Sequence, residues 1–149
     1  MTREEKRILV VDDDPAIRTL LFTILRRRGL SVDMAKHGSE AIERLGRCNY
    51  ALMLLDLMMP VMNGWEVLEK ITAMEPAVRP AAILMTAGTE PRDFDPDIVI
   101  GSIRKPFDVE LVYDTVIGCI SVLAPRKQAA DCPEPDSEQR PISGLDGEN

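Results

Sequence analysis

The sequence has little of the material from which metal-binding and nucleophilic sites are most often built. It contains one histidine, His37, and three cysteines, Cys48, Cys119 and Cys132, none of them in a CxxC spacing. A single histidine leaves little basis for a histidine-built metal site or a Ser-His-Asp triad. An odd number of widely separated cysteines argues against a zinc site or a disulfide framework and suits a reducing cytosol, so we expect a cytoplasmic protein.

The chain also lacks long apolar runs and an excess of positive charge. No apolar run approaches the ~20 residues of a membrane span, and the charged residues 1–7 show no apolar core of a signal peptide. The net charge is −7 and the pI about 4.8, which disfavours binding to nucleic acid and to anionic lipid. We therefore expect a protein that binds neither nucleic acid nor membrane.

What the chain does have is an alternation of short apolar runs and amphipathic helical patterns. The apolar runs lie at residues 8–11, 30–35, 50–56, 82–86 and 98–103. This alternation is typical of an α/β fold with a parallel sheet that is buried on both faces. The segment between the fourth and fifth runs contains Pro91 and Pro96 and little helical periodicity, so we do not expect a regular helix there.

The composition changes at Pro125. From there to the end, prolines occur among acidic residues, serine and glycine, with almost no aliphatic side chains. Such a segment buries too little apolar surface to offset the entropy lost on ordering. We expect one domain over residues 1–124, followed by a disordered, proline-rich acidic tail over residues 125–149.

Polar side chains stand at the carboxyl ends of the expected strands. They are Asp12 and Asp13 after the first, Asp56 at the end of the third, Thr86 at the end of the fourth and Lys105 after the fifth. Right-handed crossovers bring these ends to one edge of a parallel sheet, where ligands bind in open α/β folds. Clustered carboxylates repel one another by about 4 kcal/mol per pair at ~4 Å unless a cation or a shared proton relieves them. Ligands that are all oxygen select a hard ion, Mg²⁺ or Mn²⁺.

The same groups suit phosphoryl transfer. A carboxylate nucleophile, a divalent ion, the Thr86 hydroxyl and the Lys105 ammonium together stabilise the oxygens of a phosphoryl group in transit. The inferred reaction is the transfer of a phosphoryl group onto a carboxylate.

Four motifs, each at the end of an expected strand, closely resemble those of bacterial response-regulator receiver domains. They are Val10-Val11-Asp12-Asp13-Asp14-Pro15, Leu55-Asp56-Leu57-Met58-Met59-Pro60 with Asn63-Gly64, Met85-Thr86-Ala87, and Lys105-Pro106-Phe107. The resemblance covers roughly residues 6–123. It implies a doubly wound, flavodoxin-like α/β fold with five parallel strands in the order 2-1-3-4-5, here with an irregular or shortened fourth helix.

The resemblance also implies a role for each site residue. Asp56 is the phosphoacceptor, Thr86 and Lys105 contact the phosphoryl group, and Mg²⁺ is held by Asp12, Asp13, Asp56 and the backbone carbonyl of Met58. The family further implies a cis peptide bond between Lys105 and Pro106. A phosphatase is disfavoured, because such enzymes usually place a second aspartate two residues after the nucleophile, where this chain has Met58.

The function implied is a phosphorylation-dependent signalling receiver that is not itself an enzyme. It takes a phosphoryl group from a sensor histidine kinase or a histidine phosphotransfer protein and binds a downstream protein target. Because no second domain follows in the sequence, we expect a stand-alone receiver that acts through protein–protein interaction.

Two departures from the family keep a second hypothesis open. Ser102 stands three residues before Lys105, where the family usually has an aromatic side chain, and the segment from Thr86 to Lys105 is shorter than usual. The alternative is a degenerate receiver that serves as a phosphorylation-independent protein-binding module. Tyr113 and Ile117 give the last helix a second apolar stripe, which is either part of a broad core face or the surface of a homodimer or partner complex.

Overall fold

The computed structural model describes residues 4–88 and 94–136. Five parallel strands form the central sheet, and a separate two-stranded pair lies at one end of it. The elements in chain order are β1 (Glu4–Glu5), β2 (Ile8–Val11), α1 (Pro15–Arg27), β3 (Val32–Ala35), α2 (Gly38–Leu45), β4 (Leu52–Asp56), α3 (Gly64–Thr72), β5 (Ala81–Thr86), β6 (Val99–Arg104), α4 (Val109–Ser121) and β7 (Arg126–Lys127).

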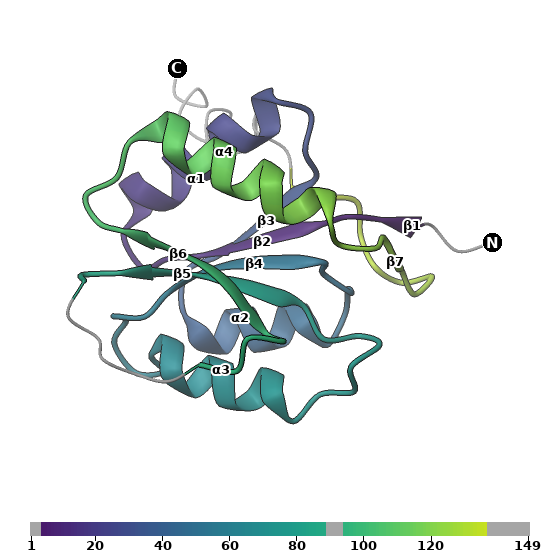
Figure 1. Cartoon of the computed structure of the whole chain (residues 1–149). Helices are drawn as coiled ribbons and strands as arrows, with labels where there is room; N and C mark the ends of the chain where they lie inside the picture. Colours follow the sequence, from purple (N-terminus) through teal and green to yellow (C-terminus); the bar gives the residue numbers. More distant parts are fainter. Residues whose placement is uncertain (1–3, 89–93, 137–149) are drawn as a thin grey trace, which may run out of the picture.

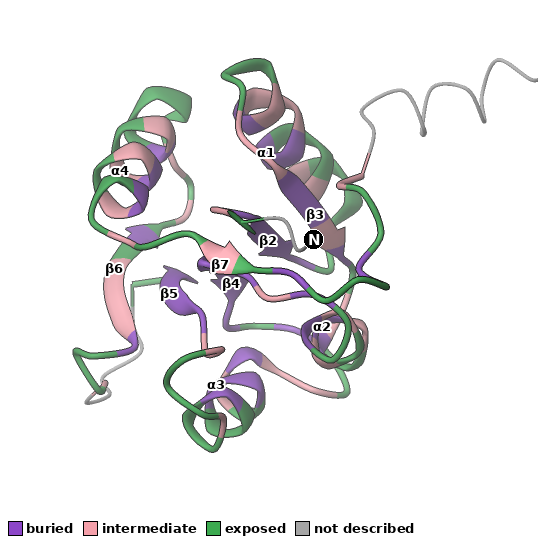
Figure 2. Ribbon diagram, turned by 90° about the vertical axis from the view of Figure 1, so that its right-hand side faces the viewer, coloured by how far each residue is buried: buried purple, intermediate pink, exposed green. Residues whose placement is uncertain are grey.

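The sheet has the predicted doubly wound topology. Its order is β3-β2-β4-β5-β6, which is 2-1-3-4-5 when its five strands are counted along the chain. Helices α1 and α4 cover one face, and α2 and α3 cover the other (Figure 1). Every residue of β2 and β4 is buried, as expected for parallel strands between two helical layers. Figure 2 shows this buried centre between the two pairs of helices.

The helices begin where local signals place them. The Asp14 side chain accepts a hydrogen bond from the Ala16 N–H, and Pro15 occupies the first position of α1, as favoured at helix starts. Helix α3 begins with a capping box in which Asn63 and Glu66 bond to each other's backbone N–H groups. These caps fix where the chain turns from a strand end into the next helix.

No described residue between β5 and β6 is helical. Residues 96–98 form a turn, and the Phe94 ring stacks on Trp65 of α3 at a centroid distance of 5.3 Å. Residues 89–93, which include Pro91, lie outside the described residues. The expectation of an irregular fourth helix agrees with this part of the structure.

The segment after the last helix folds against the domain over residues 126–136, which we call the C-terminal strap. Its strand β7 pairs antiparallel with β1, with Glu4 opposite Lys127. The predicted disorder from Pro125 onward is therefore wrong for these residues, and the predicted tail beyond them, residues 137–149, lies outside the described part of the chain. The prediction failed because it considered only the scarcity of aliphatic residues, whereas the strap is held by hydrogen bonds, ion pairs and a covalent bond.

That covalent bond is a disulfide between Cys48 and Cys132, which are 84 residues apart in sequence. It corrects the expectation that the cysteines form no disulfide. The spacing of the cysteines carried no signal, because only the path of the strap brings Cys132 to the loop before β4. Cys119 is a free thiol.

Among the helices of the described residues, none is both long and apolar enough to cross a bilayer.

Candidate functional site

The carboxyl ends of four neighbouring strands meet at one edge of the sheet (Figure 1). Asp12 follows β2, and Asp56 is the last residue of β4. Thr86 ends β5, and Lys105 follows β6. The structure thus brings together the polar residues that the strand-end motifs singled out.

Three carboxylates form a cluster at this edge. One oxygen from each of Asp12, Asp13 and Asp56 lies within 4.8 Å of the others. Asp12 and Asp56 are 1% and 4% exposed, whereas Asp13 is exposed to solvent. Two buried carboxylates and one exposed carboxylate whose oxygens lie this close together suit a hard divalent cation such as Mg²⁺.

Lys105 places a positive charge against this cluster. Its Nζ donates a hydrogen bond to Asp12 Oδ2 at 3.0 Å and lies 3.5 Å from Asp56 Oδ2. Burial opposes the charge on Lys105, but its bonds to Asp12 and Asp56 raise the pKa of the ammonium overall. Lys105 is therefore a fixed cation at neutral pH.

The backbone around Lys105 joins it to the neighbouring strand end. The Lys105 N–H donates to the carbonyl of Thr86 at 2.8 Å, and the Lys105–Pro106 peptide bond is cis, as the family resemblance implies. Thr86 is half-buried and lies opposite Arg104 in the β5–β6 register.

Asp56 has an unusual electrostatic environment. Burial and the charge of Asp12 raise the pKa of the Asp56 carboxyl to about 6, although the Met58 N–H and Lys105 oppose that rise. The Met58 N–H donates to Asp56 Oδ1 at 3.0 Å, which fixes the orientation of the carboxylate. A bound cation would favour the ionised form of Asp56 and oppose both the burial and the charge of Asp12.

Met58 is exposed beside the cluster. Its side chain is 65% exposed, so it does not cover the acidic edge by packing. The metal-binding role predicted for its backbone carbonyl remains a prediction.

Two residues at the site escaped the sequence reasoning. Arg18 of α1 donates from Nη1 to the carbonyl of Asp12 at 2.8 Å, which holds the turn that carries Asp12. Gly64 begins α3 so close to β4 that an added Cβ would lie 2.6 Å from the Asp56 carbonyl oxygen. In the sequence, Asn63-Gly64 stands out only as part of a family motif, with no sign of this close approach. Nothing local marks Arg18, since it looks like any polar residue of an exposed helix face.

A surface hollow opens beside the acidic cluster. It is lined by the start of α1, the loop before α2 and the loop before α3, and its lining includes Asp13, Arg18, Lys36 and His37. The hollow thus joins the solvent-facing carboxylate of the cluster to a rim that carries positive charge.

Known proteins give an independent measure of what the chain is similar to. Residues 8–116 match the family described as the response regulator receiver domain. The chain is 44% identical over 86 residues to transcriptional regulatory protein ResD of Bacillus subtilis, a match that covers 58% of this chain and 35% of that one. It is 31% identical over 114 residues to sporulation initiation phosphotransferase F of the same bacterium, covering 74% of this chain and 90% of that one.

A solved structure agrees with these matches. The response regulator TrrA of Thermotoga maritima, in complex with Mg²⁺-BeF, superposes with a TM-score of 0.67 at 35% identity and covers 76% of this chain and 98% of that chain. The chain spans less than half the length of the first curated relatives that it matches, 35% of ResD and 47% of a CpxR homolog of Haemophilus influenzae. Because the family match runs from the first strand of the parallel sheet well into the last helix, the chain belongs to the response regulator receiver domain family of two-component signalling.

Proposed function

We propose that this chain is a phosphorylation-dependent receiver in which Asp56 accepts the phosphoryl group. The observation that carries the proposal is the position of Asp56, a buried carboxylate at a strand end, 3.5 Å from Lys105 Nζ and clustered with Asp12 and Asp13. Asp56 therefore has the Lys105 ammonium beside it, and a phosphoryl donor can approach from the solvent-exposed side of the cluster, where Asp13 lies.

The transfer forms a bond between phosphorus and an Asp56 oxygen while the bond from phosphorus to the donor breaks. The Met58 N–H holds one Asp56 oxygen and orients the nucleophile. Lys105 offers its ammonium, and Thr86 its hydroxyl, to the equatorial oxygens of the phosphoryl group. Asp12, Asp13, Asp56 and the Met58 carbonyl are the residues that would hold Mg²⁺, which supplies additional charge neutralisation when bound.

The partners follow from this chemistry. The donor is a phosphohistidine on a sensor histidine kinase or a histidine phosphotransfer protein, in keeping with the phosphotransferase among the relatives. The output is binding to a downstream protein, and we place both events in the cytoplasm. The stand-alone arrangement stays a prediction, because several relatives are transcriptional regulators much longer than the matched region.

The decisive experiment uses the full chain with Mg²⁺ and a small phosphodonor such as acetyl phosphate. Intact-mass spectrometry is expected to find one added phosphoryl group, absent in Asp56→Asn and strongly reduced when Mg²⁺ is chelated. Asp13→Asn is the matched variant, since it keeps the acceptor and removes one carboxylate of the cluster. An adduct that persists in Asp56→Asn, or no adduct from either acetyl phosphate or a kinase, overturns the proposal.

A second candidate function is a protein-binding module that does not depend on phosphorylation. It is favoured by Ser102, which is exposed on β6 where the family usually has an aromatic residue, and by the lack of a helix in the described residues between β5 and β6. Arg104 instead packs on Gly88, close enough that a Cβ on Gly88 would lie 2.3 Å from Arg104 Nε. Partner affinity that is identical with and without beryllofluoride would establish this second function over the first.

A further inference from the structure

The C-terminal strap crosses the amino ends of the strands, at the edge of the sheet opposite Asp56 (Figures 1 and 2). Its contacts lie at both of its ends. The Gln128 side chain exchanges two hydrogen bonds of 2.7 Å with the backbone of Asn49, and the Asp136 N–H donates to Asp33 at 2.8 Å. The disulfide to Cys48 lies between these two sets of contacts.

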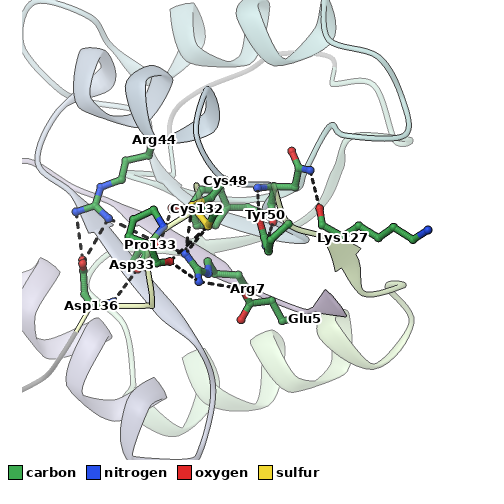
Figure 3. The surroundings of a disulfide bond; sticks show 12 residues. Glu5, Arg7, Asp33, Arg44, Cys48, Tyr50, Lys127, Cys132, Pro133 and Asp136 are labelled. Carbon is green, nitrogen blue, oxygen red and sulfur yellow. Dashed lines mark hydrogen bonds and ion pairs between the residues drawn. A yellow bond between two sulfur atoms is a disulfide. The ribbon is translucent and has the colours of Figure 1, made fainter. Parts of the chain in front are cut away.

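A fully buried cation lies against the disulfide. Arg7, just before β2, is 0% exposed. Its Nη1 lies 3.1 Å from Cys132 Sγ and 3.3 Å from Cys48 Sγ (Figure 3). Its Nη2 donates to the Pro133 carbonyl at 2.9 Å, so the guanidinium holds both the sulfurs and the strap.

The partners of Arg7 suit a charge that the disulfide does not carry. Disulfide sulfur is neutral and a weak acceptor, and Arg7 Nε has no hydrogen-bond partner among the described residues. Glu5 at 2.9 Å and Asp33 at 3.2 Å compensate the charge of the buried guanidinium, whereas the two sulfurs meet Nη1 only as weak acceptors. A thiolate at the same position would accept a charge-assisted hydrogen bond from Nη1, so the environment favours the ionised, reactive form of a reduced cysteine.

Other charged groups surround Arg7 and the two sulfurs, and they do not remove the preference for a thiolate. Asp33 is ion-paired with Arg7 at 3.2 Å and with Arg44 at 3.7 Å, and it accepts the Tyr50 hydroxyl at 2.6 Å. Its charge is therefore already engaged by several donors. Glu5 Oε2 is buried and lies 2.9 Å from Arg7 Nη2, and Asp136 lies 3.3 Å from Arg44. Each of these carboxylates is paired with an arginine, which offsets the repulsion that it exerts on a thiolate.

We propose that Cys48 and Cys132 form a thiol–disulfide redox site, with Arg7 as its positioning residue, and that oxidation fastens the C-terminal strap to the domain. A thiolate of a dithiol reductant attacks one sulfur, the Cys48–Cys132 bond breaks, and its electron pair goes to the departing sulfur, which becomes a thiolate beside Arg7. The second thiol of the reductant then releases the other cysteine. Two electrons and two protons pass to the protein, and the reductant becomes a disulfide.

Both cysteines are buried, so a reductant reaches the disulfide only after a local opening of the strap, which does not require unfolding of the domain. Cys132 itself is buried, but its neighbours Asp131 and Pro133 are exposed. Opening the strap alone therefore uncovers the sulfurs, and such local openings require less free energy than global unfolding.

Reduction also changes how well the strap covers β3, the outermost strand on one side of the sheet. Asp136 accepts a hydrogen bond from the Met34 N–H at 3.0 Å, and Met34 lies in β3, an edge strand of the sheet. Without the covalent tie, the strap is held only by noncovalent contacts, so this edge is exposed more often.

The first test equilibrates the full chain with defined ratios of reduced and oxidised dithiothreitol, then traps thiols by alkylation and measures peptide masses. We expect the Cys48–Cys132 bond to form and break reversibly while near-UV circular dichroism stays native. Cys119 is expected to be alkylated in both states. Amide hydrogen exchange of residues 128–136 should become about tenfold faster or more on reduction, with β4 unchanged. A disulfide that is reduced only in denaturant, or a strap whose exchange does not change, overturns the proposal.

The second test isolates Arg7 in the reduced protein. Alkylation of Cys48 or Cys132 is expected to reach half its maximal rate at a lower pH than alkylation of Cys119, whose thiol pKa is raised by burial. Arg7→Met should raise the pH of half-maximal alkylation for Cys48 and Cys132 while leaving that of Cys119 unchanged, and Arg7→Lys should reverse part of this shift, provided that each variant retains the native circular dichroism spectrum. The wild-type pH profile decides the question if neither variant folds. Equal profiles for all three cysteines contradict the role of Arg7.

Discussion

At the scale of single residues, the acidic edge is a balance between charges that repel and groups that compensate. Asp12 and Asp56 are buried close together, and Lys105 lies 3.0 Å from the first and 3.5 Å from the second. The Met58 N–H and one ammonium do not fully offset burial and the charge of Asp12, which raise the pKa of Asp56 to about 6. The folded protein therefore favours either a proton or a cation at this position.

This balance predicts how stability depends on pH without metal. The pKa of Asp56 rises from 3.8 to about 6 on folding, so the protonated carboxyl favours the folded state. That contribution is complete below pH 3.8 and is lost as the pH rises through 6. Two pKa units correspond to roughly 3 kcal/mol. With chelator present, Asp56→Asn should therefore be more stable than the wild type by about 2–3 kcal/mol at alkaline pH, and nearly equal to it at acid pH.

Urea unfolding of both proteins across this pH range measures the effect. The comparison between variant and wild type isolates Asp56 from the other carboxylates that titrate. Adding Mg²⁺ at alkaline pH should stabilise the wild type more than Asp56→Asn, because the cation offsets the same repulsion. A stability difference that is independent of pH would show that Asp56 ionises as freely in the folded state as in the unfolded state.

At the scale of elements, the site depends on how strand ends are joined to the helices that follow. Helix α3 begins eight residues after Asp56 and lies against the end of β4, because Gly64 lacks a Cβ there. An added Cβ would lie 2.6 Å from the Asp56 carbonyl oxygen and from Leu57 Cα, both backbone atoms. Glycine at this position is therefore a packing requirement of the β4–α3 connection.

Gly64→Ala tests this close approach. The backbone at the end of β4 must shift to make room, so we expect a loss of about 1–3 kcal/mol in the free energy of unfolding and slower phosphorylation of Asp56. Gly118→Ala is the matched control, because a Cβ at Gly118, inside α4, meets nothing within 4 Å. Alanine there should raise stability by about 1 kcal/mol through helix propensity. Chemical denaturation and acetyl phosphate labelling measure both effects, and equal behaviour of the two variants would contradict the packing argument.

At the scale of the whole molecule, the sheet has two edges with different chemistry. The carboxyl edge carries the acidic cluster, and the amino edge is crossed by the C-terminal strap with its disulfide and the buried Arg7 (Figures 1 and 3). The hydrophobic core between them has two parts, one on each face of the sheet. Events at the strap are therefore separated from Asp56 by the length of the buried strands.

We expect removal of the disulfide to lower the free energy of unfolding, by an amount that depends on redox conditions. A cross-link between residues 84 positions apart reduces the entropy of the unfolded chain by an amount equivalent to about 4–5 kcal/mol. Cys132→Ser should lose stability of this order under oxidising conditions. In excess dithiothreitol, the variant and the wild type should unfold at nearly the same denaturant concentration. A gap that is equally large with and without reductant would mean that Cys132 stabilises the fold without the disulfide.

Much of the fold and of the candidate site could be predicted from the sequence because their signals are local. Apolar runs mark β2 and β4, the Asp14-Pro15 pair marks the start of α1, and polar residues mark the strand ends. General rules for parallel sheets then bring those ends to one edge. Cys132 and Arg7 gave no such signal, since one stands in a segment with the composition of a tail and the other looks like a solvated terminal charge.

The sequence by itself therefore determined the α/β class, the strand order through its family motifs, and the residues that gather at the acidic edge. Periodicity, capping and the chemistry of strand ends depend on residues that are close in sequence, so they can be predicted without knowledge of distant contacts. Only the tertiary structure decided that Cys132 reaches Cys48, that Arg7 is buried against their sulfurs, and that residues 126–136 fold onto the domain. Those contacts join segments far apart in the chain, and their free energy depends on a geometry that no local pattern records.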